Sequence, residues 1–198
     1  MKINRLSLKN HANAILLIQE RMRVPIVHSM TGIELRSLRQ LWLDTHKSAP
    51  SSGRLPTSVL SFVQMGASPC ILSTFVSVYL NRERQQIIHG QNDTLTDTFL
   101  GVWNARNLFF GDNKLDINAA WYAARDVKAG IVAWGECNRC KAKYIFDTGH
   151  RATSKCPYCG EKNLTILGKT NEVSFEQGKR SGQTSEVIFE ERPKRNYF

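Results

Sequence analysis

Apolar residues recur at helical spacing through most of the first 130 residues, which predicts a mainly α-helical chain. The first helix is expected from Ala12 to Met22, after a basic lead-in, residues 1–10, that either lacks order or pairs with a partner. Further helices are expected at residues 59–65, 69–82, 92–110 and 116–129, the last capped by Asp116. The apolar side that we expect to face inward in the third of these consists of Leu95, Phe99, Val102, Trp103, Leu108 and Phe109.

The helix expected at residues 69–82 is apolar nearly all round, which is typical of a helix buried in a core or in a subunit interface. Large apolar side chains of the middle helices are therefore candidates for an interface with a partner subunit, although an ordinary core explains them equally well. These candidates are Phe75, Tyr79, Phe99 and Phe109.

Residues 24–44 follow the pattern of a helix-turn-helix. Pro25 suits the first turn of a short helix, and Gly32 suits the turn, where a positive φ is usually needed. Apolar residues between Ile33 and Trp42 then form the inner face of a second helix. Its opposite face carries side chains that can reach phosphates and base edges in a major groove, namely Arg36, Ser37, Arg39 and Gln40. A purely structural helical hairpin with a solvated face is the alternative.

Four of the five cysteines form two C-x-x-C pairs, Cys137 with Cys140 and Cys156 with Cys159, separated by fifteen residues. This spacing is typical of one structural Zn²⁺ held by four thiolates, a closed site with no position for a catalytic water. Disulfides or redox dithiols are the alternative, and these are rare in the cytosol. His150 lies between the pairs and is interpreted as a loop residue, and Cys70 as a small buried apolar side chain.

Short strands are expected around the cysteines, at residues 131–134, 143–146 and 164–167, and together they describe a zinc ribbon that depends on its metal. Polar and charged residues dominate from residue 169 onward, which predicts a mostly disordered tail. The expected organisation is a helix-turn-helix-like DNA-binding segment at 1–47, a helical core with the partner interface at 48–130, the zinc ribbon at 131–168 and the tail at 169–198.

The formal net charge of +10 is concentrated in two segments. Residues 1–47 carry 8 basic and 3 acidic side chains, and residues 137–168 carry 6 and 2. Such a basic field favours a polyanion, with nucleic acid as the default partner and a merely solvated surface as the alternative. Further candidate phosphate contacts, outside the helix-turn-helix, are Arg54 in the Ser/Pro/Gly-rich loop at residues 47–57 and Lys141, Lys143, Arg151 and Lys155 near the cysteines.

Several classes of protein are disfavoured by what the sequence lacks. It contains no P-loop, no G-x-S-x-G, no H-E-x-x-H and no dinucleotide-binding fingerprint, and its histidines do not cluster with carboxylates, so we expect no enzyme. No apolar run approaches the roughly 20 residues that span a bilayer, and no signal-peptide pattern opens the chain. A cytoplasmic protein without membrane contact is therefore expected.

The order of these parts resembles the FlhC family, one of the two components of the FlhD–FlhC flagellar transcriptional activator. The resemblance rests on the loop Ser48–Pro56, a helical middle ending in Ala120-Trp121 and the four cysteines. It covers roughly residues 12–165 and is most specific in the loop and in the segment from Trp121 to Cys159. Relatives of the SetC and AcaC type on mobile elements activate conjugative transfer genes. This sequence departs from the flagellar pattern at residues 57–62 and in its longer tail, which makes a mobile-element relative a contender.

The resemblance implies a DNA-binding subunit that binds promoter DNA in a heterohexamer of four FlhD-like and two FlhC-like subunits, and that recruits RNA polymerase. It maps the four zinc ligands onto Cys137, Cys140, Cys156 and Cys159, and it assigns no individual DNA contacts. The target operons would be flagellar or conjugative. The alternative is a zinc-ribbon adaptor that binds protein without sequence-specific DNA binding.

Overall fold

The computed structural model describes residues 5–91, 93–111, 115–147 and 155–167. The helical part contains α1 (Arg5–Gln19), α2 (Val24–Thr31), α3 (Leu35–His46), α4 (Val59–Gln64), α5 (Pro69–Ile88), α6 (Leu95–Asn104), α7 (Arg106–Phe110) and α8 (Ile117–Lys128). The strands β1 (Ala133–Cys137), β2 (Lys143–Phe146) and β3 (Leu164–Ile166) follow. The predicted mainly helical fold with a small C-terminal sheet that carries the cysteines is confirmed. The predicted tail and residues 1–4 lie outside the described residues.

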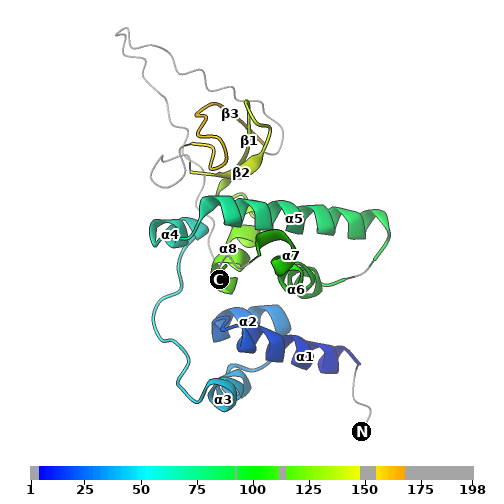
Figure 1. Ribbon diagram of the computed structural model, residues 1–198. Coiled ribbons are helices and arrows are strands. Elements are labelled where there is room, and N and C mark those ends of the chain that lie inside the picture. The colour runs from blue at the N-terminus through cyan, green and yellow to red at the C-terminus, as the bar shows by residue number, and fades with distance from the viewer. Residues whose placement is uncertain (1–4, 92, 112–114, 148–154, 168–198) are drawn as a thin grey trace, which may run out of the picture.

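Helix α5 runs through the middle of the molecule, with the sheet on one side and α6, α7 and α8 on the other (Figure 1). The segment α1 to α3 lies beyond α6 and α8 (Figure 1). Large aromatic side chains fill the core between these helices: Phe75 and Phe99 lie 5.7 Å apart between ring centroids, and both are fully buried. Tyr79 is also in this core, so three of the four candidate interface residues pack internally.

Two sequence predictions about the helices are wrong. Residues 5–10 are helical and belong to α1, because Asn10 and Lys9 make long-range polar contacts that local pattern does not reveal. The helix expected at 92–110 divides at Ala105 into α6 and α7, so one apolar face does not continue along it. Leu108 and Phe109 of α7, which were expected to face inward, are therefore 85% and 51% exposed. Leu95, the first residue of α6 and also expected to face inward, is 53% exposed.

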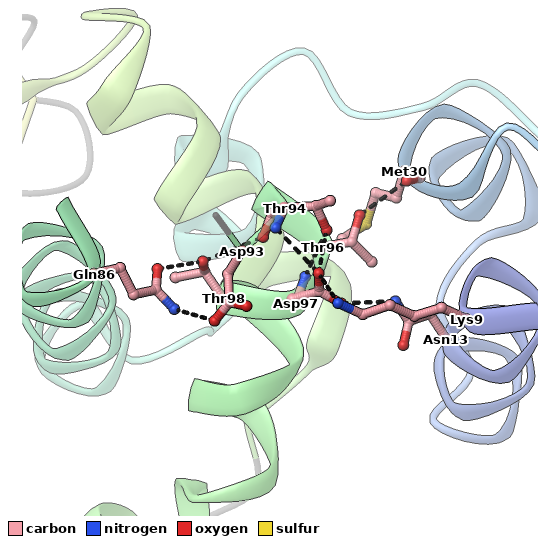
Figure 2. A network of polar contacts seen from close by, with 9 residues as sticks. All are labelled: Lys9, Asn13, Met30, Gln86, Asp93, Thr94, Thr96, Asp97 and Thr98. Carbon is pink, nitrogen blue, oxygen red and sulfur yellow. Dashed lines mark hydrogen bonds and ion pairs between the residues drawn. The ribbon is translucent and has the colours of Figure 1, made fainter. Parts of the chain in front are cut away.

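The start of α6 is joined to the first two helices by a polar network (Figure 2). Thr94 and Asp97 form a capping box, each side chain bonding to the other residue's backbone N–H. Asp97 also forms an ion pair with Lys9 of α1 at 2.6 Å, and Thr96 donates to the backbone carbonyl of Met30 in α2 at 2.8 Å. These contacts fix the helix-turn-helix segment against the rest of the helical core.

The sheet is antiparallel, in the order β2-β1-β3, and it packs directly on α5. The backbone N–H of Ile145 in β2 donates to the buried Ser73 hydroxyl of α5 at 3.0 Å. Ile145 and Trp134 belong to the same apolar cluster as the helices. Gly135 in β1 allows β3 to approach, because a Cβ there would lie 2.2 Å from Leu164 Cδ1. The helices thus contribute to holding the cysteine-bearing sheet in place.

Candidate metal centre and nucleic-acid interface

The four cysteines of the two C-x-x-C pairs meet in one cluster, with their sulfur atoms all within 4.8 Å of one another. Cys137 Sγ lies 3.5 Å from Cys159 Sγ, and Cys140 Sγ lies 3.6 Å from Cys156 Sγ. Both separations are far longer than the roughly 2.05 Å of a disulfide. They are close to the edge of about 3.8 Å that a tetrahedron of sulfurs about 2.3 Å from a central zinc would have.

The two pairs adopt matching backbone turns. In the first, the N–H of Lys141 donates to the carbonyl of Cys137 at 2.9 Å, and in the second the N–H of Gly160 donates to that of Cys156, also at 2.9 Å. Lys141 and Gly160 occupy equivalent positions and both have a positive φ, 60° and 76°. The cluster is therefore built from two copies of one knuckle, brought face to face by the pairing of β1 with β2 and β3.

Backbone N–H groups point at the sulfurs in both knuckles. Burial of Cys137 raises the pKa of its thiol, but hydrogen bonds from the N–H groups of Cys140 and Arg139 outweigh burial and lower this pKa to about 7. The N–H groups of Tyr158 and Cys159 also donate to Cys156, but there burial outweighs them and raises the pKa of the thiol. Because a metal ligand must be a thiolate, donors aimed at sulfur favour metal binding.

The donor set fits a closed tetrahedral metal site. Four sulfur ligands leave no coordination position for water, so the arrangement supports structure and no metal-based catalysis. Tyr144 is buried beside the cluster, and burial together with the nearby cysteines raises the pKa of its phenol to about 12. The phenol therefore stays protonated and does not compete with the thiols for a metal ion. The structure therefore holds a candidate metal site at the predicted cysteines.

The second knuckle also contacts the helical core. The hydroxyl groups of Tyr158 and of Thr74 in α5 lie 2.8 Å apart, and the Tyr158 hydroxyl donates to the carbonyl of Cys70 at 3.3 Å. Cys70 is partly exposed, which differs from its predicted burial, because it lies in the first turn of α5, before Leu72, the first buried residue of that helix. The cysteine cluster is thus joined to α5 through both β2 and the second knuckle.

The helix-turn-helix prediction is matched by α2, Gly32 in a left-handed conformation with φ 70°, and α3. Leu38 and Trp42 are buried on the inner face of α3. All four candidate DNA-contacting residues of α3 are exposed on the other face: Arg36, Ser37, Arg39 and Gln40. Gln40 Nε2 donates to Asp44 Oδ1 at 3.0 Å on that face. The geometry leaves both the DNA-binding and the structural-hairpin interpretation available.

The other candidate phosphate contacts lie in two places. Arg54 is exposed in the loop between α3 and α4. Lys141, Lys143 and Lys155 are exposed around the knuckles, whereas Arg151 lies outside the described residues. The cysteine-bearing sheet and α3 lie on opposite sides of the central helices (Figure 1), so these lysines and the α3 side chains form two separate basic regions of the chain.

Sequence reasoning missed Arg23 and Asn118, which organise the turn between α1 and α2. Arg23 donates from its guanidinium to the backbone carbonyls of Gly53 and Arg54, at 2.8 and 3.2 Å. Asn118 of α8 accepts from the backbone N–H of Arg23 at 2.8 Å. No periodicity signals such contacts, because their partners lie 30 to 95 residues away in the sequence.

None of the described helices is long and apolar enough to cross a bilayer. Comparison with known proteins shows a similarity to the flagellar transcriptional regulator FlhC of Gallionella capsiferriformans (strain ES-2), 24% identical over 151 residues, which are 75% of this chain and 81% of that protein. The family described as "Flagellar transcriptional activator (FlhC)" matches residues 5–171. That match spans most of the described fold, including α3 and all four cysteines, and the chain therefore belongs to the FlhC family of flagellar transcriptional activators, which are not enzymes.

Proposed function

We propose that this chain is the DNA-binding subunit of a heteromeric transcriptional activator that binds promoter DNA and recruits RNA polymerase. The observation that carries the proposal is the exposed face of α3, where Arg36, Ser37, Arg39 and Gln40 lie opposite the buried Leu38 and Trp42. Arg36 and Ser37 lie in the first turn of α3, the part of a recognition helix that contacts base edges.

The basic side chains around the knuckles supply a second contact region in this proposal. Lys141, Lys143 and Lys155 are exposed there, and with Arg54 they would neutralise phosphates and set the register of the subunit on the duplex. Arg36 and Arg39 are the proposed base readers, since an arginine can donate two parallel hydrogen bonds to guanine. Two regions on one chain lengthen the contacted stretch of DNA.

The proposed metal is one structural Zn²⁺ held by the four cysteines. Four thiol ligands in a tetrahedral arrangement are the set that zinc prefers, and iron–sulfur chemistry is the main competitor for such ligands. The proposed partner is an FlhD-like subunit, in a heterohexamer of four FlhD-like chains and two copies of this chain. The exposed apolar side chains Leu108 and Phe109 of α7 are available for such a contact.

The test is a salt-titrated DNA-binding assay on the chain co-purified with an FlhD-like subunit. The probes are the upstream regions of flagellar operons, those of conjugative transfer operons, and an unrelated duplex. Binding to one promoter set about a thousandfold tighter than to the unrelated duplex would support the proposal and identify the target operons. Weak and equal binding to all probes would contradict it and favour the alternative, a zinc-ribbon adaptor that binds protein.

The role of α3 is tested by the double variant Arg36→Gln/Arg39→Gln, with Arg84→Gln on the exposed side of α5 as a control for the loss of one exposed charge away from α3. Loss of a specific base contact costs about 1–3 kcal/mol per position, so the double variant should lose most of its discrimination between promoter and unrelated duplex. The control should keep it. Retained discrimination in the double variant would assign α3 to the structural-hairpin interpretation.

A further inference from the structure

The turn between α1 and α2 is held rigidly by one buried side chain of α8. Asn118 is 8% exposed, and its Oδ1 accepts from the backbone N–H of Arg23 at 2.8 Å. Its Nδ2 donates to the backbone carbonyl of Arg21 at 3.3 Å. The side-chain amide of Asn118 thus bonds to the backbone on both sides of Met22. The backbone from which the side chains of Arg21 and Arg23 extend is therefore fixed.

Arg23 connects this turn to the loop between α3 and α4. Its Nη2 donates to the carbonyl of Gly53 at 2.8 Å and its Nη1 to the carbonyl of Arg54 at 3.2 Å. Gly53 has φ 109°, a conformation that residues with a side chain rarely adopt, so the bend presented to Arg23 depends on glycine. The exposed side chain of Arg54 therefore leaves the loop at the point where Arg23 holds it.

Arg21, Arg23 and Arg54 have few acidic groups nearby to neutralise their charge. Glu20 pairs with Arg106 at 3.0 Å instead of with its neighbour Arg21. Asp116, the N-cap of α8, accepts from the N–H groups of Asn118 and Ala119 and forms no ion pair with Arg21, Arg23 or Arg54 among the described residues. Positive charge at the turn is thus left available to an external anion.

The backbone of Arg21 is a second, independent sign of a functional position. Arg21 follows the end of α1 with φ 63°, in the left-handed region where glycine is the usual residue. An arginine in this conformation carries steric strain that glycine would avoid, and strained residues concentrate at binding sites. In this conformation Arg21 is exposed to solvent.

We infer that the turn carrying Arg21 and Arg23 and the loop carrying Arg54, which Arg23 joins, form one contact region for phosphates of the DNA backbone, in which Arg23 is the positioning residue for Arg54. The inference rests on the proposed DNA binding and adds a site to it. Guanidinium groups suit phosphate because they donate paired hydrogen bonds to its oxygens. A backbone phosphate carries no sequence information, so the site orients the subunit and does not select its operator.

The experiment uses the complex with the FlhD-like subunit and measures the slope of log affinity against log salt on promoter and unrelated duplexes. Arg21→Gln and Arg54→Gln should each reduce this slope by about 0.9 and weaken both probes equally. Arg23→Lys keeps the charge but loses the guanidinium group that donates to the backbone carbonyls of Gly53 and Arg54. It should abolish the contribution of Arg54, so that adding Arg54→Gln to Arg23→Lys has no further effect. Arg84→Gln on α5 is the charge-matched control.

The outcomes separate this site from the proposed function. If the unaltered complex shows salt-dependent binding while Arg21→Gln and Arg54→Gln keep its slope and affinity, the phosphate site is overturned and the proposed function stands. If Arg23→Lys and Arg54→Gln act additively, the positioning role is overturned. If the unaltered complex shows no salt-dependent binding, both fail. Equal melting temperatures of the variants establish that each change acts on binding and not on folding.

Discussion

The carboxylate of Asp126, close to the end of α8, accepts a hydrogen bond at 2.6 Å from the backbone N–H of Val59, the first residue of α4. Asp126 is fully buried and forms an ion pair with the neighbouring Arg125 at 2.6 Å. Arg125 in turn donates to the carbonyl of Thr57 at 3.0 Å. Burial raises the pKa of Asp126, and the hydrogen bond from Val59 and the charge of Arg125 oppose this rise. The buried carboxylate of Asp126 thus holds the end of the loop between α3 and α4 against α8.

Replacing Asp126 by alanine should lower the free energy of unfolding by about 2–3 kcal/mol, because the buried N–H of Val59 loses its acceptor and Arg125 loses its partner. Asp126→Asn keeps an acceptor and should cost less. Urea denaturation gives the free energies. Asp44→Ala, at an exposed position on α3, is the control and should change stability by less than about 0.5 kcal/mol. Equal effects at the two positions would remove Asp126 from the interactions that hold the loop.

The polar network at the start of α6 predicts a pH dependence of stability (Figure 2). Burial raises the pKa of Asp97, but hydrogen bonds from Lys9, Thr94 and Asn13 outweigh burial and lower this pKa from 3.8 to about 2. A lowered pKa means that the stabilisation is complete above the unfolded value of 3.8 and is lost as the pH falls towards 2.

Asp97→Asn should therefore reduce the free energy of unfolding by about 1–2 kcal/mol at pH 5.5 and by much less at pH 2.5. The measured quantity is the difference between the unaltered chain and the variant at each pH, since this difference cancels every other titrating group, including the cysteines. Asp44→Asn, at an exposed position on α3 outside this network, is the acidic control. A difference that stays constant between pH 5.5 and 2.5 would contradict the assigned role of Asp97.

Local pattern predicted those features whose cause is local. The C-x-x-C spacing dictates two knuckles, Gly32 permits a left-handed turn, and Asp116 caps the helix that follows it. The exposure of Phe109 could not be predicted in this way, because an apolar residue on a helix does not reveal whether another element covers it. The contact of Arg23 with Gly53 depends on two turns meeting in space, which helical periodicity does not encode.

Removal of the proposed Zn²⁺ should disrupt the sheet and its contact with α5. Three short strands bury too little apolar surface to stay paired alone, and once the cation is gone the cysteines take up protons and no longer join the two knuckles. We expect one zinc ion per chain by elemental analysis. Chelation should expose residues 131–147 and 155–167 to protease and shift the fluorescence of Trp134, which is 9% exposed, to longer wavelength.

The matched variants for this test are Cys137→Ser and Cys70→Ser. Cys137 is buried within the cluster, whereas Cys70 lies outside it in α5. The first variant should lose the metal and the second should keep it. Protease resistance of residues 131–147 and 155–167 that survives chelation would show that the helical core alone holds the sheet, and the proposed Zn²⁺ would then have no structural role.

The two knuckles provide a last prediction that separates folding from DNA binding at a single residue. Lys141 has φ 60° at the position that glycine occupies in the second knuckle, where Gly160 has φ 76°. Glycine adopts this conformation without a steric penalty, so Lys141→Gly should raise the free energy of unfolding by about 0.5–1 kcal/mol. Lys141→Gln keeps the strain and should leave stability unchanged within about 0.5 kcal/mol.

Both variants remove the charge, so both should reduce the salt slope of DNA binding by about 0.9 if Lys141 contacts a phosphate. Denaturation and DNA-binding titrations on the same three proteins measure the two effects independently. If Lys141→Gly is more stable and the salt slope is unchanged, the equivalence of the two knuckles is supported and Lys141 does not contact DNA. If Lys141→Gly is less stable, the equivalence of the two knuckles is contradicted.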